Sequence, residues 1–141
     1  MITYVDASTL LKLVIDEDGS DRAATIWTSS DTVASVALTV VEARAALAAA
    51  RRGGRLTTRQ HAEAKAELGA LLADLHIVQP TEQLIAAAAD LTEAEGLRGY
   101  DAVHLAAALL VEATVLTSAD TELCSAAQRQ GLHIANPLVA T

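Results

Sequence analysis

Aromatic side chains are scarce in this sequence of 141 residues, which contains two tyrosines, one tryptophan and no phenylalanine. Hydrophobic residues nevertheless make up 52% of the chain, which argues against an intrinsically disordered protein. The length fits one domain, residues 1–141, with enough chain to bury a core. That core must be built from valine, leucine, isoleucine and alanine on closely approaching helices. The shortage also leaves no aromatic stacking platform of the kind that single-strand binders use.

Cysteine and long apolar runs are equally rare. Cys124 is the only cysteine, so no disulfide can form within the chain, as is usual in a reducing cytoplasm. No apolar run approaches the ~20 residues that cross a bilayer, and the first residues do not resemble a signal peptide. We therefore expect a cytoplasmic protein without a membrane span.

Basic residues are few, with 10 lysines and arginines against 18 aspartates and glutamates, which gives a net charge of −8. A chain of this charge needs local positive charge, a bound metal or a basic partner if it is to meet nucleic acid. The one basic cluster comprises Arg51, Arg52, Arg55 and Arg59. It could contact phosphates or simply form a soluble helix end and loop. Arg44 could pair with a carboxylate or a phosphate.

Short β-branched runs alternate with stretches of helical periodicity along the whole chain. We expect strands at residues 2–5, 32–36, 76–78, 114–117 and 132–135. We expect helices at residues 7–15, 21–28, 39–52, 58–75, 82–95, 99–112 and 121–130, the fourth of them opened by a capping box of Thr57 and Gln60. This alternation predicts an α/β fold of three layers, with a central, mainly parallel sheet of about four to five strands between helices.

Four acidic residues stand at positions that such a fold brings to one edge of its sheet. Asp6 and Asp120 follow predicted strands, and ligands bind beyond the carboxyl ends of parallel strands. Glu42 and Asp101 fall in the first turns of helices that begin at the same edge. Each acid could simply cap a helix or complement its dipole. The apolar neighbours of Glu42 and Asp101 instead favour a partner or a metal, and oxygen ligands suit Mg²⁺ or Mn²⁺.

Four segments of the chain resemble the four motifs of PIN-domain nucleases, and in particular of VapC-type toxins from type II toxin–antitoxin pairs. These segments are Tyr4–Lys12, the stretch around Glu42, Arg98–Ala106 and Thr117–Asp120. The resemblance covers nearly the whole chain. It implies a PIN-like fold and an endoribonuclease that depends on Mg²⁺, with Mn²⁺ as a substitute. It also implies a homodimer and inhibition by a cognate VapB-type antitoxin.

The resemblance also assigns expected roles to individual residues. By position, Asp6 and Asp101 match the principal metal ligands, Glu42 and Asp120 match acids that complete the pocket, and Ser8 and Ser118 match supporting hydroxyls of the first and fourth acids. Ser118 stands where threonine is more usual in the family, and the hydroxyl is retained. The RNA target, the cleavage sequence and the number of metal ions stay open.

Other interpretations of the same residues are a non-catalytic or DNA-directed protein of this fold, or a receiver-like signalling domain with an acidic pocket. A receiver needs a pair of acids after its first strand and a lysine after its fifth, whereas Lys12 and Lys65 are the only lysines and neither lies there. His104, three residues after Asp101, could help the site, but we expect it to be a packed or hydrogen-bonded structural histidine. We expect the acidic stretch of residues 16–21 to form a solvated loop.

Overall fold

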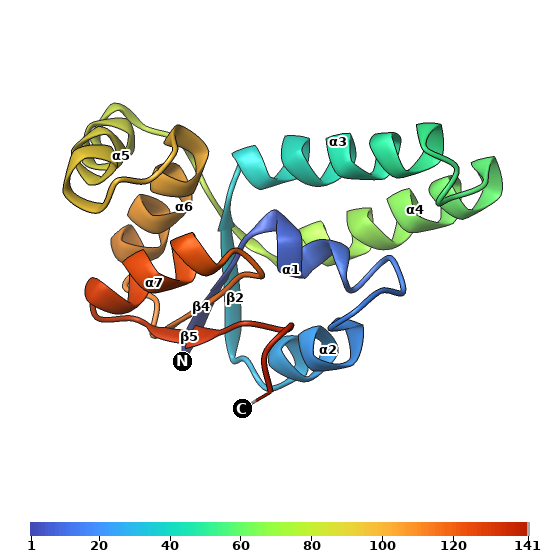
Figure 1. The fold of residues 1–141 in the computed structure, drawn as a ribbon, viewed down its shortest axis with the longest axis horizontal. Coiled ribbons are helices and arrows are strands. Elements are labelled where there is room, and N and C mark those ends of the chain that lie inside the picture. The colour runs from blue at the N-terminus through green and yellow to red at the C-terminus, as the bar shows by residue number, and fades with distance from the viewer. Residues whose placement is uncertain (141) are drawn as a thin grey trace.

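The computed structural model describes residues 1–140 and contains one sheet with helices on both faces (Figure 1). The strands are β1 (Ile2–Val5), β2 (Thr32–Val36), β3 (His76–Val78), β4 (Val115–Thr117) and β5 (His133–Ala135). The helices are α1 (Ala7–Leu11), α2 (Ser20–Thr28), α3 (Leu38–Arg52), α4 (Thr58–Asp74), α5 (Glu82–Glu95), α6 (Gly99–Leu110) and α7 (Thr121–Arg129). All strand pairs are parallel. The predicted three-layer α/β/α fold is confirmed.

The order of the strands, β3-β2-β1-β4-β5, places β1 at the centre of the sheet. The chain moves from β1 outward to β2 and β3, then returns past β1 to β4 on the other side. The junction of β1 and β4 is therefore the point where the strand order reverses, which is where open α/β sheets form a crevice. Val5 is in register with Thr117 across this junction. Asp6 and Ser118, one residue further along each strand, must consequently emerge side by side.

The core is divided by the sheet into two clusters of small aliphatic side chains. Tyr4 and Leu116 pack with α5, α6 and α7, whereas Val5 packs with α1, α3 and α4. Tyr4 and Val5 serve opposite clusters because successive side chains of a strand point to opposite faces. The helix α6 carries three consecutive buried alanines, Ala106, Ala107 and Ala108, and packs against α5. This agrees with the aliphatic core predicted from the scarcity of aromatic residues.

The first helix is shorter than the periodicity predicts, since it ends at Leu11 rather than at residue 15. The acidic stretch after it folds back on the helix. Glu17 accepts from the buried Lys12 at 3.0 Å and from Arg55 at 3.0 Å. The Ser20 hydroxyl also accepts from the Glu17 N–H at 3.0 Å. The prediction of a fully solvated acidic loop is therefore wrong for Glu17, which anchors the loop, although Asp16, Asp18 and Asp21 are exposed.

The remaining boundaries lie within a residue or two of the prediction, and the capping box of Thr57 and Gln60 that opens α4 is present. No helix within residues 1–140 combines the length and the apolar character needed to span a membrane. The long helices α3 and α4 run side by side away from the sheet, so the far ends of both lie well away from the β1–β4 junction (Figure 1).

Candidate active site

Asp6 is a buried carboxylate at the carboxyl end of β1, with an exposed fraction of 6%. Its Oδ1 accepts from the Ser8 hydroxyl at 2.7 Å and from the Thr9 N–H at 3.2 Å, and its Oδ2 accepts from the Ser118 hydroxyl at 2.6 Å. Asp6 is therefore the N-cap of α1, as one interpretation predicted, and its orientation is fixed both by α1 and by the residue that follows β4. Burial raises the pKa of Asp6, and the charge of His104 and the three hydrogen bonds only partly oppose this effect.

The two serines both donate to Asp6, and Ser118 reaches Asp120 through the backbone. The Ser118 hydroxyl donates to Asp6 and accepts from the backbone N–H of Asp120 at 3.0 Å, so it does not support the carboxylate of Asp120. The Ser8 hydroxyl accepts from the Ala119 N–H at 2.9 Å, which ties the loop after β4 to α1. The Cys124 thiol donates to the Ser118 carbonyl at 3.4 Å, and burial raises the pKa of this thiol to about 11.

Asp101, in the first turn of α6, and Asp120, the N-cap of α7, approach each other. Oδ1 of Asp120 caps α7 by accepting from the N–H groups of Glu122 and Leu123 at 2.9 and 3.3 Å. Oδ2 lies 3.5 Å from the guanidinium of Arg98, which is also 3.4 Å from Oδ2 of Asp101. Burial raises the pKa of Asp101, and the charge of Asp120 raises it further against the effect of Arg98. Two carboxylates thus share a single cation.

Glu42 lies in the second turn of α3, because this helix begins at Leu38 rather than at Thr39. The prediction that Glu42 stands in a first turn, where it would complement the helix dipole, is therefore wrong. Its surroundings are also less apolar than predicted, since the neighbouring Val41 is 65% exposed. The Glu42 carboxylate is instead held by a side chain from the opposite helix, the imidazole of His104 on α6, at 2.6 Å.

His104 belongs to a chain of hydrogen bonds. The Tyr4 hydroxyl accepts from the Val36 N–H at 3.2 Å and lies 2.7 Å from Nδ1 of His104. On the other side of the ring, Nε2 lies 2.6 Å from Oε1 of the Glu42 carboxylate, which can only accept when it is ionised. The chain crosses the core from β2 through β1 and α6 to α3, and it ends at the site.

The charges around His104 also connect the acids electrostatically. Burial lowers the pKa of His104, but the hydrogen bond to Glu42 and the charges of Asp6, Glu42 and Asp101 outweigh that effect and raise it. The prediction of a hydrogen-bonded histidine is correct, and the ring also binds Glu42, one of the four acids. Its spacing of three residues from Asp101 on one helix was the signal that could have placed it there.

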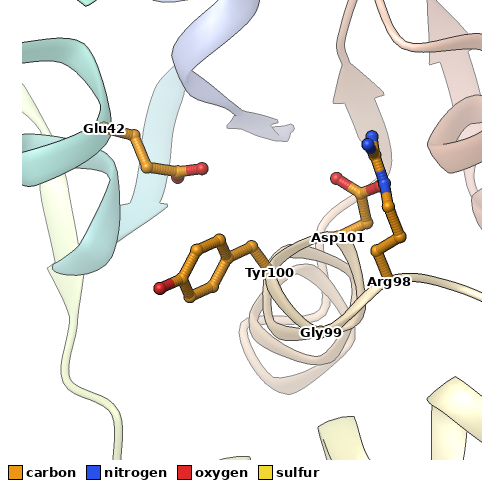
Figure 2. A pocket seen from close by; sticks show the side chains of 5 residues that line it. All are labelled: Glu42, Arg98, Gly99, Tyr100 and Asp101. Carbon is orange, nitrogen blue, oxygen red and sulfur yellow. The ribbon is translucent and has the colours of Figure 1, made fainter. Parts of the chain in front are cut away.

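Two of the four acids, Glu42 and Asp101, line a cavity of about 440 Å³ together with Arg98, Gly99 and Tyr100. Figure 2 shows Glu42 projecting from α3 and Asp101 projecting from α6, with the Arg98 guanidinium beside Asp101. The Tyr100 ring extends across the space from α6 towards α3. Asp6 and Asp120 are not among the lining residues. Sequence reasoning assigned no role to Arg98 or Tyr100, although both flank Asp101 in the chain.

The other predicted basic residues lie elsewhere. Arg44, Arg51 and Arg52 are exposed and form no ion pair with the described residues, whereas Arg55 pairs with Glu17. Arg44 therefore does not pair with a carboxylate in this structure. Arg52 stands ten residues beyond Glu42 on α3, which corresponds to about 15 Å along a helix. The structure does not bring this cluster to the acids, and its contact with RNA stays a prediction.

The donor set of the site consists of carboxylate oxygens, which suit a hard divalent cation. Among residues 1–140, no three acidic, histidine or cysteine side chains are arranged to enclose a metal ion. Mg²⁺ needs no such cage, because it keeps several waters and is usually held by one or two carboxylates. A positive charge already sits between Asp101 and Asp120 in the form of Arg98. The residues therefore fit a hydrated Mg²⁺ ion.

Comparisons to known proteins agree with this fold. The family model of the PIN domain matches residues 3–128, and the chain belongs to the PIN-domain family. Ribonuclease VapC45 of Mycobacterium tuberculosis (strain CDC 1551 / Oshkosh) is 38% identical to the chain over 136 residues, 95% of this chain and 94% of the relative.

Solved structures extend this similarity to the fold. PAE2754 from Pyrobaculum aerophilum has a TM-score of 0.70 at 25% identity, over 95% of this chain and 83% of its own. A chain of a toxin–antitoxin complex from Klebsiella pneumoniae has a TM-score of 0.66 at 18% identity, over 96% and 97% of the two chains. The predicted resemblance to VapC-type PIN domains is confirmed.

We expect Tyr4→Phe to lower the free energy of unfolding by about 1–3 kcal/mol, because the phenyl ring leaves the Val36 N–H and Nδ1 of His104 buried and unpaired. Denaturant titration monitored by circular dichroism measures this change. Tyr100→Phe is the matched control, since the Tyr100 side chain is exposed, and it should change stability by less than about 0.5 kcal/mol. Equal stability of Tyr4→Phe and the unmodified protein would contradict the hydrogen-bond chain.

Proposed function

We propose that this chain is a magnesium-dependent endoribonuclease of the VapC type that hydrolyses phosphodiester bonds in RNA. The observation that carries the proposal is the convergence of Asp6, Glu42, Asp101 and Asp120 around His104 and Arg98 at the β1–β4 junction. The 38% identity to a ribonuclease over nearly the full length of both chains supports the same activity. The acids on the rim of an open sheet, rather than the fold alone, link this chain to phosphodiester chemistry.

In this proposal Asp6 and Asp101 hold Mg²⁺, or Mn²⁺ in its place, and Glu42 and Asp120 complete the pocket directly or through water. The cation would lower the pKa of a bound water and offset the charge of the phosphate. Ser8 and Ser118 orient Asp6, so that its carboxylate needs no rearrangement to meet the cation. Burial raises the pKa values of Asp6 and Asp101 because it removes the water that stabilises their charge. A bound cation would stabilise the charged carboxylates in place of that water.

Glu42 has a different task from the metal-binding pair. His104 donates to Oε1 and thereby fixes the carboxylate at the cavity, which leaves Oε2 to orient or deprotonate the attacking water. His104 is therefore a positioning residue for Glu42 rather than a group that meets the substrate.

We also propose that the protein acts in the cytoplasm as a homodimer and is inhibited by a cognate VapB-type antitoxin. The net charge of −8 suits a basic partner. The guanidinium of Arg98 between Asp101 and Asp120 indicates that a basic side chain fits among the acids. A protein of the same fold belongs to a toxin–antitoxin complex in Klebsiella pneumoniae. Co-purification with the product of an adjacent reading frame would test the partnership.

We expect purified protein, freed of any partner, to cleave a structured RNA in the presence of Mg²⁺ and to lose this activity when a chelator is added. Added Mg²⁺ or Mn²⁺ in excess of the chelator should restore cleavage. Gel electrophoresis of an end-labelled RNA transcript measures its cleavage. Single-stranded DNA of the same sequence is treated in parallel. Cleavage that persists in chelator would refute the metal dependence. Equal cleavage of DNA would favour a DNA-directed protein of this fold. A folded protein that cleaves neither substrate would favour a non-catalytic protein.

A further inference from the structure

The cavity beside the acids contains two groups that the proposed metal chemistry does not use, Arg98 and Tyr100. Its volume of about 440 Å³ lies within the range of ~300–1,000 Å³ that is typical of small-molecule sites. One wall is acidic, with Glu42 and Asp101, and the rest combines a cation with an aromatic ring. The ligand of such a cavity should therefore carry both an anionic group and a flat apolar group.

Tyr100 presents the one aromatic ring of this cavity to solvent. The side chain is 65% exposed, and it takes part in none of the side-chain hydrogen bonds or aromatic contacts of residues 1–140. By contrast, Tyr4 is fully buried and bonded to His104. Figure 2 shows the Tyr100 ring reaching from α6 into the space in front of Glu42. An aromatic face beside an acid cluster is suited to stacking against an unpaired base.

Arg98 is exposed, and both of its contacts with the acids are long. Its side chain is 79% exposed, and it lies 3.4 Å from Asp101 and 3.5 Å from Asp120. Charge-assisted hydrogen bonds of a guanidinium to a carboxylate are usually ~2.7–2.9 Å long, so neither contact holds Arg98 firmly. A cation on these carboxylates would compete with the guanidinium. The Arg98 guanidinium, once released from the carboxylates, can bind a phosphate group through two N–H donors.

We propose that Tyr100 and Arg98 form a subsite for a single unpaired nucleotide next to the acids, in which Tyr100 stacks on the base and Arg98 binds the adjoining phosphate. This inference rests on the proposed ribonuclease function and adds a substrate class to it, RNA with an unpaired base at the cleavage site. A base inside an A-form duplex is stacked and paired, so it cannot present its face to Tyr100. The proposed subsite uses one aromatic ring, so it is smaller than the stacking platforms of single-strand binders.

The first test measures binding without cleavage. Adenosine 5′-monophosphate contains no phosphodiester bond, and its binding in the presence of Mg²⁺ can be followed by NMR shifts of residues 98–101. Tyr100→Ala should weaken this binding roughly 5- to 100-fold, the scale of one base–aromatic stack, whereas Tyr100→Phe should keep it within about twofold. Arg98→Ala should weaken binding of the monophosphate more than that of adenosine. Arg22→Ala, which removes an exposed arginine on α2, and Leu110→Ala at the far end of α6 are matched controls.

The second test uses cleavage of an unpaired hexaribonucleotide and of the same sequence in a duplex. Tyr100→Ala should raise KM for the single strand with little change in kcat, and the duplex should be the poorer substrate of the unmodified protein. Unchanged nucleotide binding and KM in both variants would overturn the subsite while leaving the ribonuclease function intact. A protein that binds the monophosphate through Tyr100 but cuts no RNA would overturn the function instead. Loss of a dimer in Tyr100→Ala, measured by sedimentation, would assign the ring to a protein interface and overturn the subsite.

Discussion

Asp101→Asn is expected to lower the rate of RNA cleavage by roughly 10²- to 10³-fold or more, the scale on which single preorganised electrostatic groups act. The amide has the shape of the carboxylate but not its charge, so it binds Mg²⁺ weakly and attracts Arg98 less. Since Asp101 lies at the rim with 15% of its side chain exposed, the exchange should leave the fold intact. The measurement is the single-turnover cleavage rate of a labelled RNA, with circular dichroism to verify folding.

Asp90→Asn provides the matched control for Asp101→Asn, because it makes the same chemical change on an exposed site of α5. It should cleave RNA at the rate of the unmodified protein. Both variants are purified in the same way, so a contaminating ribonuclease would act equally in both preparations. A difference in cleavage between them therefore belongs to the protein itself. Full activity of a folded Asp101→Asn protein would refute the assignment of Asp101 as a metal ligand.

Asp6→Asn is expected to have two effects of opposite sign, loss of cleavage and a gain in stability of the metal-free protein at neutral pH. Burial is the largest cause of the raised pKa of Asp6, so its ionised form is unfavourable in the folded state. The neutral amide removes this penalty, which is about 1.4 kcal/mol for each unit by which the pKa is raised. Its oxygen can still accept from Ser8 and Thr9, and its N–H can donate to the Ser118 oxygen.

The pH dependence distinguishes this explanation from a packing effect. The folded state holds the proton of Asp6 more tightly than the unfolded chain does, so this residue contributes stability below its ordinary pKa. That contribution is lost as the pH rises through the raised value. The difference in Tm between Asp6→Asn and the unmodified protein should therefore be near zero at about pH 4 and positive at pH 7. Each kcal/mol corresponds to a rise of roughly 2–8 °C.

Added Mg²⁺ gives the companion measurement for Asp6. It should raise the Tm of the unmodified protein at pH 7, because an ion that binds only the folded state stabilises it. It should have little effect on Asp6→Asn. Ser118→Ala is a useful comparison, since it removes one donor to Asp6 but keeps the charge, and it should lower stability. A Tm of Asp6→Asn below that of the unmodified protein at pH 7 would contradict the account of Asp6 as a destabilising buried charge.

Local patterns were sufficient to predict the secondary structure because they act over a few residues. The capping box at Thr57 and the turn after Glu95 mark helix ends through contacts within one turn of the chain. The prediction was wrong where a side chain bonds to a residue far away in the sequence. The ion pairs of Glu17 with Lys12 and Arg55 fold a loop that the sequence alone presented as solvated. These pairs join residues up to 38 positions apart, which no local periodicity encodes.

The sequence by itself determined the parallel α/β fold and the edge of the sheet to which the four acids belong, since strand ends and helix starts are readable along the chain. Only the tertiary structure decided which groups meet there. The strand order puts β4 beside β1, and this alone lets Ser118 donate to Asp6 across 112 residues. The arrangement of α3 and α6 at this edge of the sheet joins His104 to Glu42 in the same way. A hydrogen bond depends on positions in space within a few tenths of an ångström, and those positions follow from the packing of the whole chain.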